Sequence, residues 1–297
     1  MTNLTLKQLR YFDALAREKH FGRAADRSAI SQPALSMQIR DLEEELGASL
    51  IERGPRQVRL TRLGEQFLER VQVILRSVDE LGELARASRS DLAGELRIGV
   101  IPTIAPYLLP QVISALDRTY PGLDLRVRET LTERLLAELN EGRIDAAIVA
   151  LPVSEPGLVE TPLFSEEFVL VRPISQADQP VPQVDDLAAM KLLLLEEGHC
   201  FRDQALSFCD TARARPRDGL DGSSLTTLVQ MVAAGLGITL IPEMAVPVEA
   251  RSAGVATARF PGVRPGRSVG MIWRKSNPLG TQLARVAEVV QEAAGNA

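Results

Sequence analysis

Cysteine and histidine are scarce in this chain of 297 residues, which contains two of each. Two cysteines are too few for the disulfide framework of a small secreted domain. Two histidines and two cysteines are also too few, and too badly spaced, for a zinc cluster. The sequence therefore predicts neither a disulfide scaffold nor a metal site, and it contains no cofactor motif.

Long hydrophobic runs are missing as well. The longest weakly polar stretch, 231–248, is interrupted by Gly235, Gly237 and Pro242, which break a membrane-spanning helix. Residues 1–20 carry charges throughout, which excludes a signal peptide. We therefore expect a cytoplasmic protein without a membrane partner and, at this length, about two domains.

Positive charge is not in excess, because the net charge is −5. The distribution is uneven, with +2 over residues 1–60 and −7 over the remainder. A slightly basic head on an acidic body fits a small DNA-binding module with a separate regulatory domain.

Residues 1–60 have the pattern of a helix-turn-helix. Apolar residues recur at helical spacing over 6–15, and small Ala24 and Ala25 would let a second short helix approach closely. Ser31 suits the N-cap of a third helix, which ends at Gly47. The second helix of such a pair enters the major groove with its N-terminal residues at the base edges. The polar residues expected to read the bases there are Gln32, Ser36 and Arg40.

A β-wing is predicted directly after this helix, because two short strand-like pieces flank a Gly54-Pro55 turn. We expect Arg53, Arg56 and Arg59 to contact phosphates and set the register on DNA. The alternative is an ordinary helical subdomain with a solvated arginine turn, although the whole arrangement favours DNA binding.

A long helix is predicted from Arg62 to about Ser88. Its apolar residues are spaced 4-4-3-4-3-4, a heptad seam typical of a coiled coil. The seam consists of Leu63, Phe67, Val71, Ile74, Val78, Leu81 and Ala85. A single helix cannot bury this seam, so we expect a dimer through it; the alternative is that the seam packs on its own chain.

Strands alternate with helices from Gly94 onward, which is typical of βαβ units and a parallel sheet. Strands are expected at 96–101, 123–129, 144–150, 168–171, 191–195, 238–241 and 269–273. A closing helix begins at Gly280. The number of units suffices for two α/β lobes, and ligands favour the cleft at the C-terminal ends of the strands.

The two cysteines lie nine residues apart in a segment with the features of a redox device. His199 and Arg202 are cationic neighbours of Cys200, and a nearby cation favours the reactive thiolate form of a thiol. If 200–209 is one helix, the thiols lie about 13–14 Å apart along its axis on opposite faces. A disulfide with Cys209 needs Cα atoms within about 7 Å, so the helix would have to unwind and the bond would act as a switch.

The chain resembles the LysR-type transcriptional regulators from end to end. The motifs of the head that carry the resemblance are 9–12 (LRYF), 24–25 (AA), 31–36 (SQPALS) and 46–47 (LG). The hydrogen-peroxide-sensing branch of that family is similar in 198–205 (GHCFRDQA), with a second cysteine at 209, and in 101–110 and 231–240.

The resemblance implies an all-α winged helix-turn-helix head at 1–61 and a linker helix at 62–90. It implies an α/β two-lobed, periplasmic-binding-protein-like regulatory domain at 91–297. Lobe I then covers about 91–163 and 268–297, and lobe II about 164–267. The family usually assembles as a homotetramer, and its implied partners are promoter DNA, RNA polymerase and a thiol reductant.

By resemblance, Cys200 attacks hydrogen peroxide to form a sulfenic acid, and Cys209 resolves it to a disulfide. The residues implied for the peroxide pocket are Thr103, Thr132, His199, Arg202, Asp203 and Arg274. Ser31 and Pro33 join the expected DNA-binding residues.

The expected function is therefore that of a transcriptional activator and not of an enzyme. Two alternative functions remain. One is a regulator that binds a small metabolite in the interlobe cleft, with Cys200 incidental. The other is a thiol peroxidase, for which the winged head and the heptad seam have no role.

Overall fold

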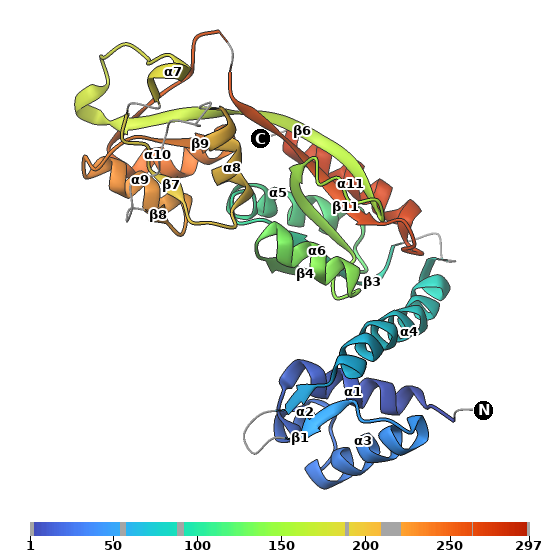
Figure 1. Ribbon diagram of the computed structural model, residues 1–297. Helices are drawn as coiled ribbons and strands as arrows, with labels where there is room; N and C mark the ends of the chain where they lie inside the picture. The colour runs from blue at the N-terminus through green and yellow to red at the C-terminus, as the bar shows by residue number, and fades with distance from the viewer. Residues whose placement is uncertain are drawn as a thin grey trace. The chain divides into compact units, whose positions relative to one another are not determined.

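The computed structural model describes residues 3–53, 58–87, 92–187, 190–208, 221–262 and 264–295. The chain divides into two compact units, Met1–Ala85 and Arg86–Ala297 (Figure 1). Among the described residues, no helix combines the length and the apolar character needed to cross a membrane.

Three helices form the body of the first unit, as predicted: α1 (Leu6–Glu18), α2 (Phe21–Arg27) and α3 (Gln32–Leu46). The Ser31 hydroxyl caps α3 by accepting the amide of Ala34 at 3.4 Å. Gly47 ends the helix with a φ of 64°, in the left-handed region that glycine tolerates best. Ala24 and Ala25 are fully buried, which lets α2 approach its neighbours closely.

Two antiparallel strands follow α3 and confirm the predicted wing: β1 (Ile51–Arg53) and β2 (Val58–Leu60). The Glu43 carboxylate accepts the amides of Leu50 and Ile51, at 2.8 and 3.1 Å, and so ties the wing to α3. The turn between the strands lies outside the described residues.

The long helix α4 (Arg62–Ala87) is also present. Some of its heptad-seam residues are buried and others are exposed. Val71 is buried against the head, and the ring of Phe67 meets the edge of Phe12 at a centroid distance of 5.5 Å. Farther along, Ile74 and Leu81 are 45% and 66% exposed. Part of the seam therefore packs on its own chain, whereas part of it stays uncovered within this chain.

The second unit is built on a sheet with the strand order β10-β6-β11-β5-β3-β4, to which β9 adds by pairing with β6 (Figure 1). The strands are β3 (Gly94–Val100), β4 (Leu123–Glu129), β5 (Ala146–Leu151), β6 (Leu158–Pro173), β9 (Thr239–Pro242), β10 (Val255–Ala258) and β11 (Gly266–Arg274). The helices are α5 (Ala105–Thr119), α6 (Thr132–Asn140), α7 (Val184–Leu187), α8 (Cys200–Phe208), α9 (Leu225–Ala233), α10 (Val246–Ala253) and α11 (Gly280–Gly295). Two-residue strands β7 (Leu194–Leu195) and β8 (Asp221–Gly222) pair separately.

The sheet is mixed, so the expectation of a parallel sheet was only partly right. β3 pairs in parallel with β4 and β5, as βαβ units require, but β11 runs antiparallel to both β5 and β6. β6 is one strand of 16 residues, where the sequence predicted only its second part. Its first part carries polar residues such as Glu160, Thr161 and Ser165, and so lacks the continuous apolar run of a buried strand.

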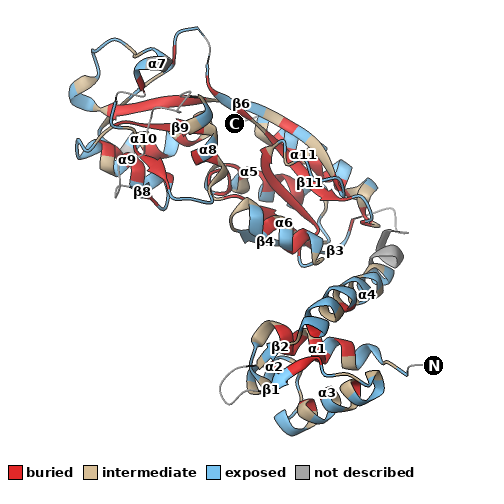
Figure 2. Cartoon of the chain, in the orientation of Figure 1, coloured by how far each residue is buried: buried red, intermediate tan, exposed pale blue. Residues whose placement is uncertain are grey.

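Two hydrophobic cores define two lobes of the second unit. The first core surrounds β3 and β5 and includes Leu163 on β6, and the second includes Phe168 farther along the same strand. Figure 1 shows β6 passing both lobes, with β11 beside its first part and β9 and β10 beside its second part, and Figure 2 shows buried residues in both lobes. The continuous strand β6 thus joins the two lobes.

Candidate functional site

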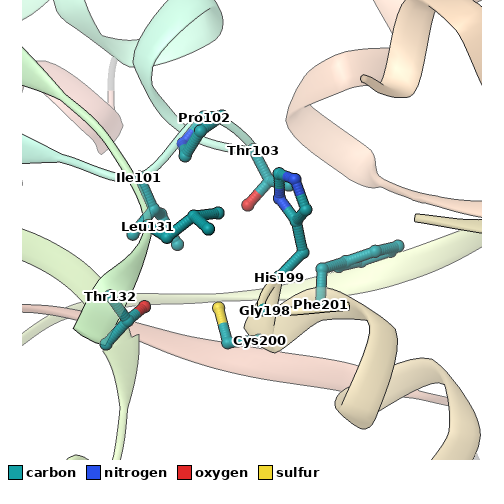
Figure 3. A pocket seen from close by; sticks show the side chains of 9 residues that line it. All are labelled: Ile101, Pro102, Thr103, Leu131, Thr132, Gly198, His199, Cys200 and Phe201. Atoms are coloured by element: carbon teal, nitrogen blue, oxygen red, sulfur yellow. The ribbon is translucent and has the colours of Figure 1, made fainter. Parts of the chain in front are cut away.

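A small pocket surrounds Cys200 where the two lobes meet (Figure 3). The first lobe contributes the loop after β3 and the start of α6, and the second lobe contributes the turn before α8. The lining residues are Ile101, Pro102, Thr103, Leu131, Thr132, Gly198, His199, Cys200 and Phe201. The predicted pocket residues that the fold brings together here are Thr103, Thr132, His199 and Cys200.

Cys200 is the first residue of α8, and the turn before the helix depends on glycine. Gly198 has a φ of 93°, a left-handed conformation that a side chain disfavours. The amides in the first turn of a helix lack intrahelical partners and favour negative charge nearby. The turn therefore places the thiol at the positive end of α8 and inside the pocket.

The Thr132 hydroxyl is buried and has no hydrogen-bond partner among the described residues. Figure 3 shows its oxygen pointing across the pocket towards the sulfur of Cys200. An unpaired buried hydroxyl costs about 1–3 kcal/mol. A small polar ligand bound between Thr132 and Cys200 would offset that cost by forming a hydrogen bond with the hydroxyl.

The Thr103 hydroxyl is oriented from behind by Arg267. Arg267 Nη1 donates to Thr103 Oγ1 at 2.8 Å, and Nη2 donates to the Thr103 carbonyl at 3.0 Å. A guanidinium can only donate, so the hydroxyl accepts this bond and keeps its own hydrogen for another acceptor. The Thr103 hydroxyl is therefore available as a hydrogen-bond donor to a ligand in the pocket.

Arg267 is a functional candidate that the sequence reasoning missed. Its side chain has no exposed surface, and both Nε and Nη2 lie 2.8 Å from Glu166 Oε1. Its guanidinium carbon lies 5.7 Å from the ring centroid of Phe201, the neighbour of Cys200. An arginine at the start of a largely apolar strand was the available signal, but only the pairing of β11 with β6 places Arg267 beside Glu166.

The structure does not bring Arg274 to the pocket, so that expectation was wrong. Arg274 donates to the carbonyl of Leu139 at the end of α6. It lies seven residues beyond Arg267 on β11, which is about 23 Å along an extended strand. The cation that reaches the pocket wall is therefore Arg267.

Arg202 and Asp203 are also absent from the pocket lining. The buried guanidinium of Arg202 donates to the carbonyl of Leu195 at 2.6 Å and pairs with Asp221 at 3.2 Å. Asp203 is exposed on α8. Arg202 thus fastens α8 to β7 and β8 and does not face the thiol pocket.

His199 does not supply the positive charge that its position beside Cys200 suggested. Burial lowers the pKa of His199, and this effect outweighs the opposing influence of the nearby Glu196 carboxylate. The imidazole is consequently neutral near pH 7, and it can donate one hydrogen bond and accept another.

Aromatic contacts hold α8 near both ends. Phe201 meets Phe168 on β6 at a centroid distance of 4.8 Å, and Phe208 meets Phe260 at 5.7 Å, both edge to face. Cys209 lies outside the described residues, directly after the last residue of the helix.

A larger cleft of about 330 Å³ adjoins the thiol pocket between the same two lobes. Its hydroxyl-rich lining includes Tyr107, Ser224 and Thr226. Tyr107 donates to the buried carboxylate of Glu249 at 2.7 Å, and Thr226 donates to the same oxygen at 3.0 Å. Burial, followed by this hydrogen bond, raises the pKa of Tyr107 well above its usual range.

The DNA-binding candidates of the head lie on α3, at its N-cap and on the wing. Gln32, Pro33 and Arg40 are exposed on α3, Ser36 is half-buried, and Ser31 serves as the cap. Arg59 is exposed on β2. The side chain of Arg53 and the whole of Arg56 lie outside the described residues.

Family models match both units of the chain. Residues 6–65 match the helix-turn-helix of the lysR family of bacterial regulatory proteins, and residues 89–295 match the LysR substrate binding domain. The chain therefore belongs to the LysR family, as the sequence predicted, and this is a family of transcription regulators and not of enzymes.

Relatives within the family are similar over nearly the whole chain. The DNA-binding transcriptional dual regulator OxyR of Escherichia coli K12 is 41% identical over 290 residues, which cover 97% of this chain and 95% of the relative. A probable hydrogen peroxide-inducible genes activator of Streptomyces viridosporus is 43% identical over 294 residues, covering 97% and 94%.

Solved structures agree with these relatives. A full-length OxyR variant from Pseudomonas aeruginosa has a TM-score of 0.78 at 38% identity, covering 98% of this chain and 96% of its own. A cysteine-to-serine mutant of Corynebacterium glutamicum OxyR with hydrogen peroxide bound has a TM-score of 0.68 at 38% identity, covering 98% and 93%.

Proposed function

We propose that this protein regulates transcription in response to hydrogen peroxide, with Cys200 as the reacting thiol. The observation that carries the proposal is the Thr132 hydroxyl, which has no hydrogen-bond partner among the described residues and faces Cys200 in the pocket between the lobes. The names of the relatives and the peroxide-bound structure support the same signal.

The pocket supplies the groups that the first chemical step needs. The Cys200 thiolate attacks one peroxide oxygen, the O–O bond breaks, and the sulfur becomes a sulfenic acid. The second oxygen leaves with the bonding electron pair and takes up a proton to become water. The Thr103 hydroxyl, oriented by Arg267, donates to this departing oxygen, while Thr132 and neutral His199 hold the peroxide in line.

The second step is attack by the Cys209 thiolate on the sulfenic sulfur, which expels hydroxide and forms the disulfide. Eight helical steps separate the Cα atoms of Cys200 and Phe208 by about 12 Å. The next Cα is about 3.8 Å from that of Phe208, so the two cysteine Cα atoms are at least about 8 Å apart, beyond the roughly 7 Å that a disulfide allows. The last turn of α8 therefore has to unwind, which separates Phe208 from Phe260.

The DNA-binding head is the output of this switch. We propose that α3 enters the major groove with Gln32, Ser36 and Arg40 at the bases, and that the wing arginines contact phosphates. The uncovered Ile74 and Leu81 on α4 support a dimer through this helix. Unwinding α8 then repositions the subunits of a tetramer on promoter DNA, and a thiol reductant resets the protein.

We place the functional boundaries at 1–61, 62–90 and 91–297. Within the last segment, lobe I comprises about 91–163 and 268–297, and lobe II about 164–267. The two hydrophobic cores support this division, because β6 passes from one core to the other between Leu163 and Phe168.

The test combines mass spectrometry with DNA footprinting before and after one equivalent of hydrogen peroxide. We expect a peptide pair joined through Cys200 and Cys209, together with a changed footprint on DNA. Cys200→Ser is expected to show neither change, while Ser207→Ala, a matched exposed change on α8, is expected to keep both. An unchanged footprint in the wild type despite complete oxidation would contradict the coupling.

The polar cleft beside the pocket supports a second candidate, a regulator that responds to a small metabolite. In that case Cys200→Ser would leave the cellular response to the inducing condition intact. Loss of the response in Cys200→Ser, with normal DNA affinity, separates the two functions in favour of the peroxide sensor.

A further inference from the structure

We infer that Met37 contacts thymine methyl groups of the operator and so sets part of its sequence specificity. This inference rests on α3 entering the major groove as proposed above. The feature behind it is a largely exposed apolar side chain that lies outside the hydrophobic core of the head.

Met37 is 56% exposed, although it lies in the middle of a helix whose other large apolar residues are buried or half-buried. Leu35, Ile39 and Leu42 are at most 2% exposed and form the core-facing side of α3. Met37 lies about 200° around the helix from Leu35, directly opposite that side. Its side chain therefore projects from the outer face of the head.

The charge along α3 indicates which part of this face can approach DNA. Residues 41–45 include Asp41, Glu43, Glu44 and Glu45, which phosphates repel. No acidic residue occurs over 32–40, which ends in exposed Arg40. Only the N-terminal part of α3 is thus suited to the groove, and Met37 is its sixth residue.

The chemistry of the groove then selects the partner. Along the major-groove edges, the thymine C5 methyl is the apolar group, whereas the remaining edge groups are hydrogen-bond donors and acceptors. Gln32, Ser36 and Arg40 match donors and acceptors, but a thioether side chain matches a methyl. Pro33, the other apolar residue on this face, already serves the start of the helix. Met37 is long and flexible, which suits contact with a methyl group at varied positions.

The experiment removes the methyl group from the DNA and the thioether from the protein. The probe is a duplex that the full-length protein has selected from random-sequence DNA, with each thymine replaced singly by deoxyuridine, which lacks only the methyl. At one or two positions in each half-site we expect the wild type to lose about fourfold in affinity, the equivalent of one buried methyl. Met37→Ala is expected to bind thymine and uracil duplexes equally, and Met37→Leu to retain the discrimination.

Met190→Ala is the matched control, because Met190 is 37% exposed and lies in the second unit. It is expected to discriminate like the wild type, and thermal melting of each variant confirms that the head is folded. Discrimination that persists in Met37→Ala, or no effect of any uracil on the wild type, overturns the inference. A changed oligomeric state of Met37→Ala in sedimentation also overturns it, since Met37 would then serve a subunit contact. Failure of the wild type to select any DNA sequence would instead refute the proposed DNA binding.

Discussion

Replacing Glu166 by alanine removes the counter-charge of a fully buried cation. The side chains of Arg267 and Glu166 are 0% and 6% exposed, and two guanidinium nitrogens lie 2.8 Å from one carboxylate oxygen. The other carboxylate oxygen accepts the amide of Met244 at 3.2 Å. The substitution therefore leaves a positive charge and a backbone donor without this partner inside the protein.

The expected cost follows from this burial. Breaking a buried ion pair by removing one partner destabilises a protein by about 3–5 kcal/mol, because the remaining charge stays out of water. For a unit of 86–297, each kcal/mol lowers the melting temperature by about 2–4 °C, so the total decrease is about 6–20 °C. The loss concerns the second unit, where both residues lie.

Fluorescence of Trp273 is the assay, because it is the chain's single tryptophan and is buried on β11. Its change during urea unfolding reports the second unit without interference from the head. The matched control is Glu167→Ala, next in sequence, since Glu167 pairs at 2.9 Å with Arg264 in an exposed position. An exposed pair contributes at most about 1 kcal/mol.

A double variant tests the same reasoning in the opposite direction. Glu166→Leu combined with Arg267→Met replaces the pair by apolar side chains of similar length and so removes the unpaired charge. We expect this variant to be more stable than Glu166→Ala but less stable than the wild type, because the Met244 amide and the Thr103 carbonyl still lose a partner. Equal stability losses for Glu166→Ala and Glu167→Ala would refute the reasoning. A double variant that is no more stable than Glu166→Ala would refute it as well.

Three further predictions concern the Cys200 pocket and its helix. Thr132→Val is expected to slow oxidation of Cys200 by peroxide about tenfold or more in stopped-flow measurements, without loss of stability, because the hydroxyl has no protein partner to lose. Equal rates in variant and wild type would exclude Thr132 from peroxide binding. Phe260→Ala is expected to speed closure of the disulfide about 2–10-fold after a peroxide pulse. The reason is that the edge-to-face pair of Phe208 and Phe260 contributes about 0.5–1.5 kcal/mol to the cost of unwinding α8. A rate of disulfide closure equal to that of the wild type would show that Phe208 does not leave Phe260 during this step. Because the pKa of His199 is lowered in the folded state, the unfolded chain binds more protons below about pH 6.5. The stability of the second unit is therefore expected to fall as the pH decreases from 6.5 towards that lowered pKa, and His199→Gln, measured through Trp273, is expected to lose this part of the decrease.

Features decided by a few neighbouring residues could be predicted from the sequence alone. The cap at Ser31, the stop at Gly47 and the buried face of α3 depend on local hydrogen bonds and helical periodicity. For the segment after Cys200 the sequence supported only a conditional statement, that one helix over 200–209 would hold the two thiols too far apart for a disulfide. The structure supplies the helix over Cys200–Phe208. The family motifs in the head also lie in such local segments, and the match over 6–65 confirms them.

Other features depend on strand pairing between distant parts of the chain. The sequence offered Arg202 and Arg274 as cations for the pocket, yet Arg267 reaches Thr103, which precedes it by more than 160 residues. That contact exists because β11 pairs antiparallel with β6 and places Arg267 opposite Glu166, in a register that no local signal encodes. Burial likewise changed the role of His199, since only the folded lobes withdraw its imidazole from water. The sequence by itself thus determined the family, the helices and the pair of thiols, whereas the tertiary structure decided which charge serves the pocket, because desolvation and pairing register arise only when the lobes assemble.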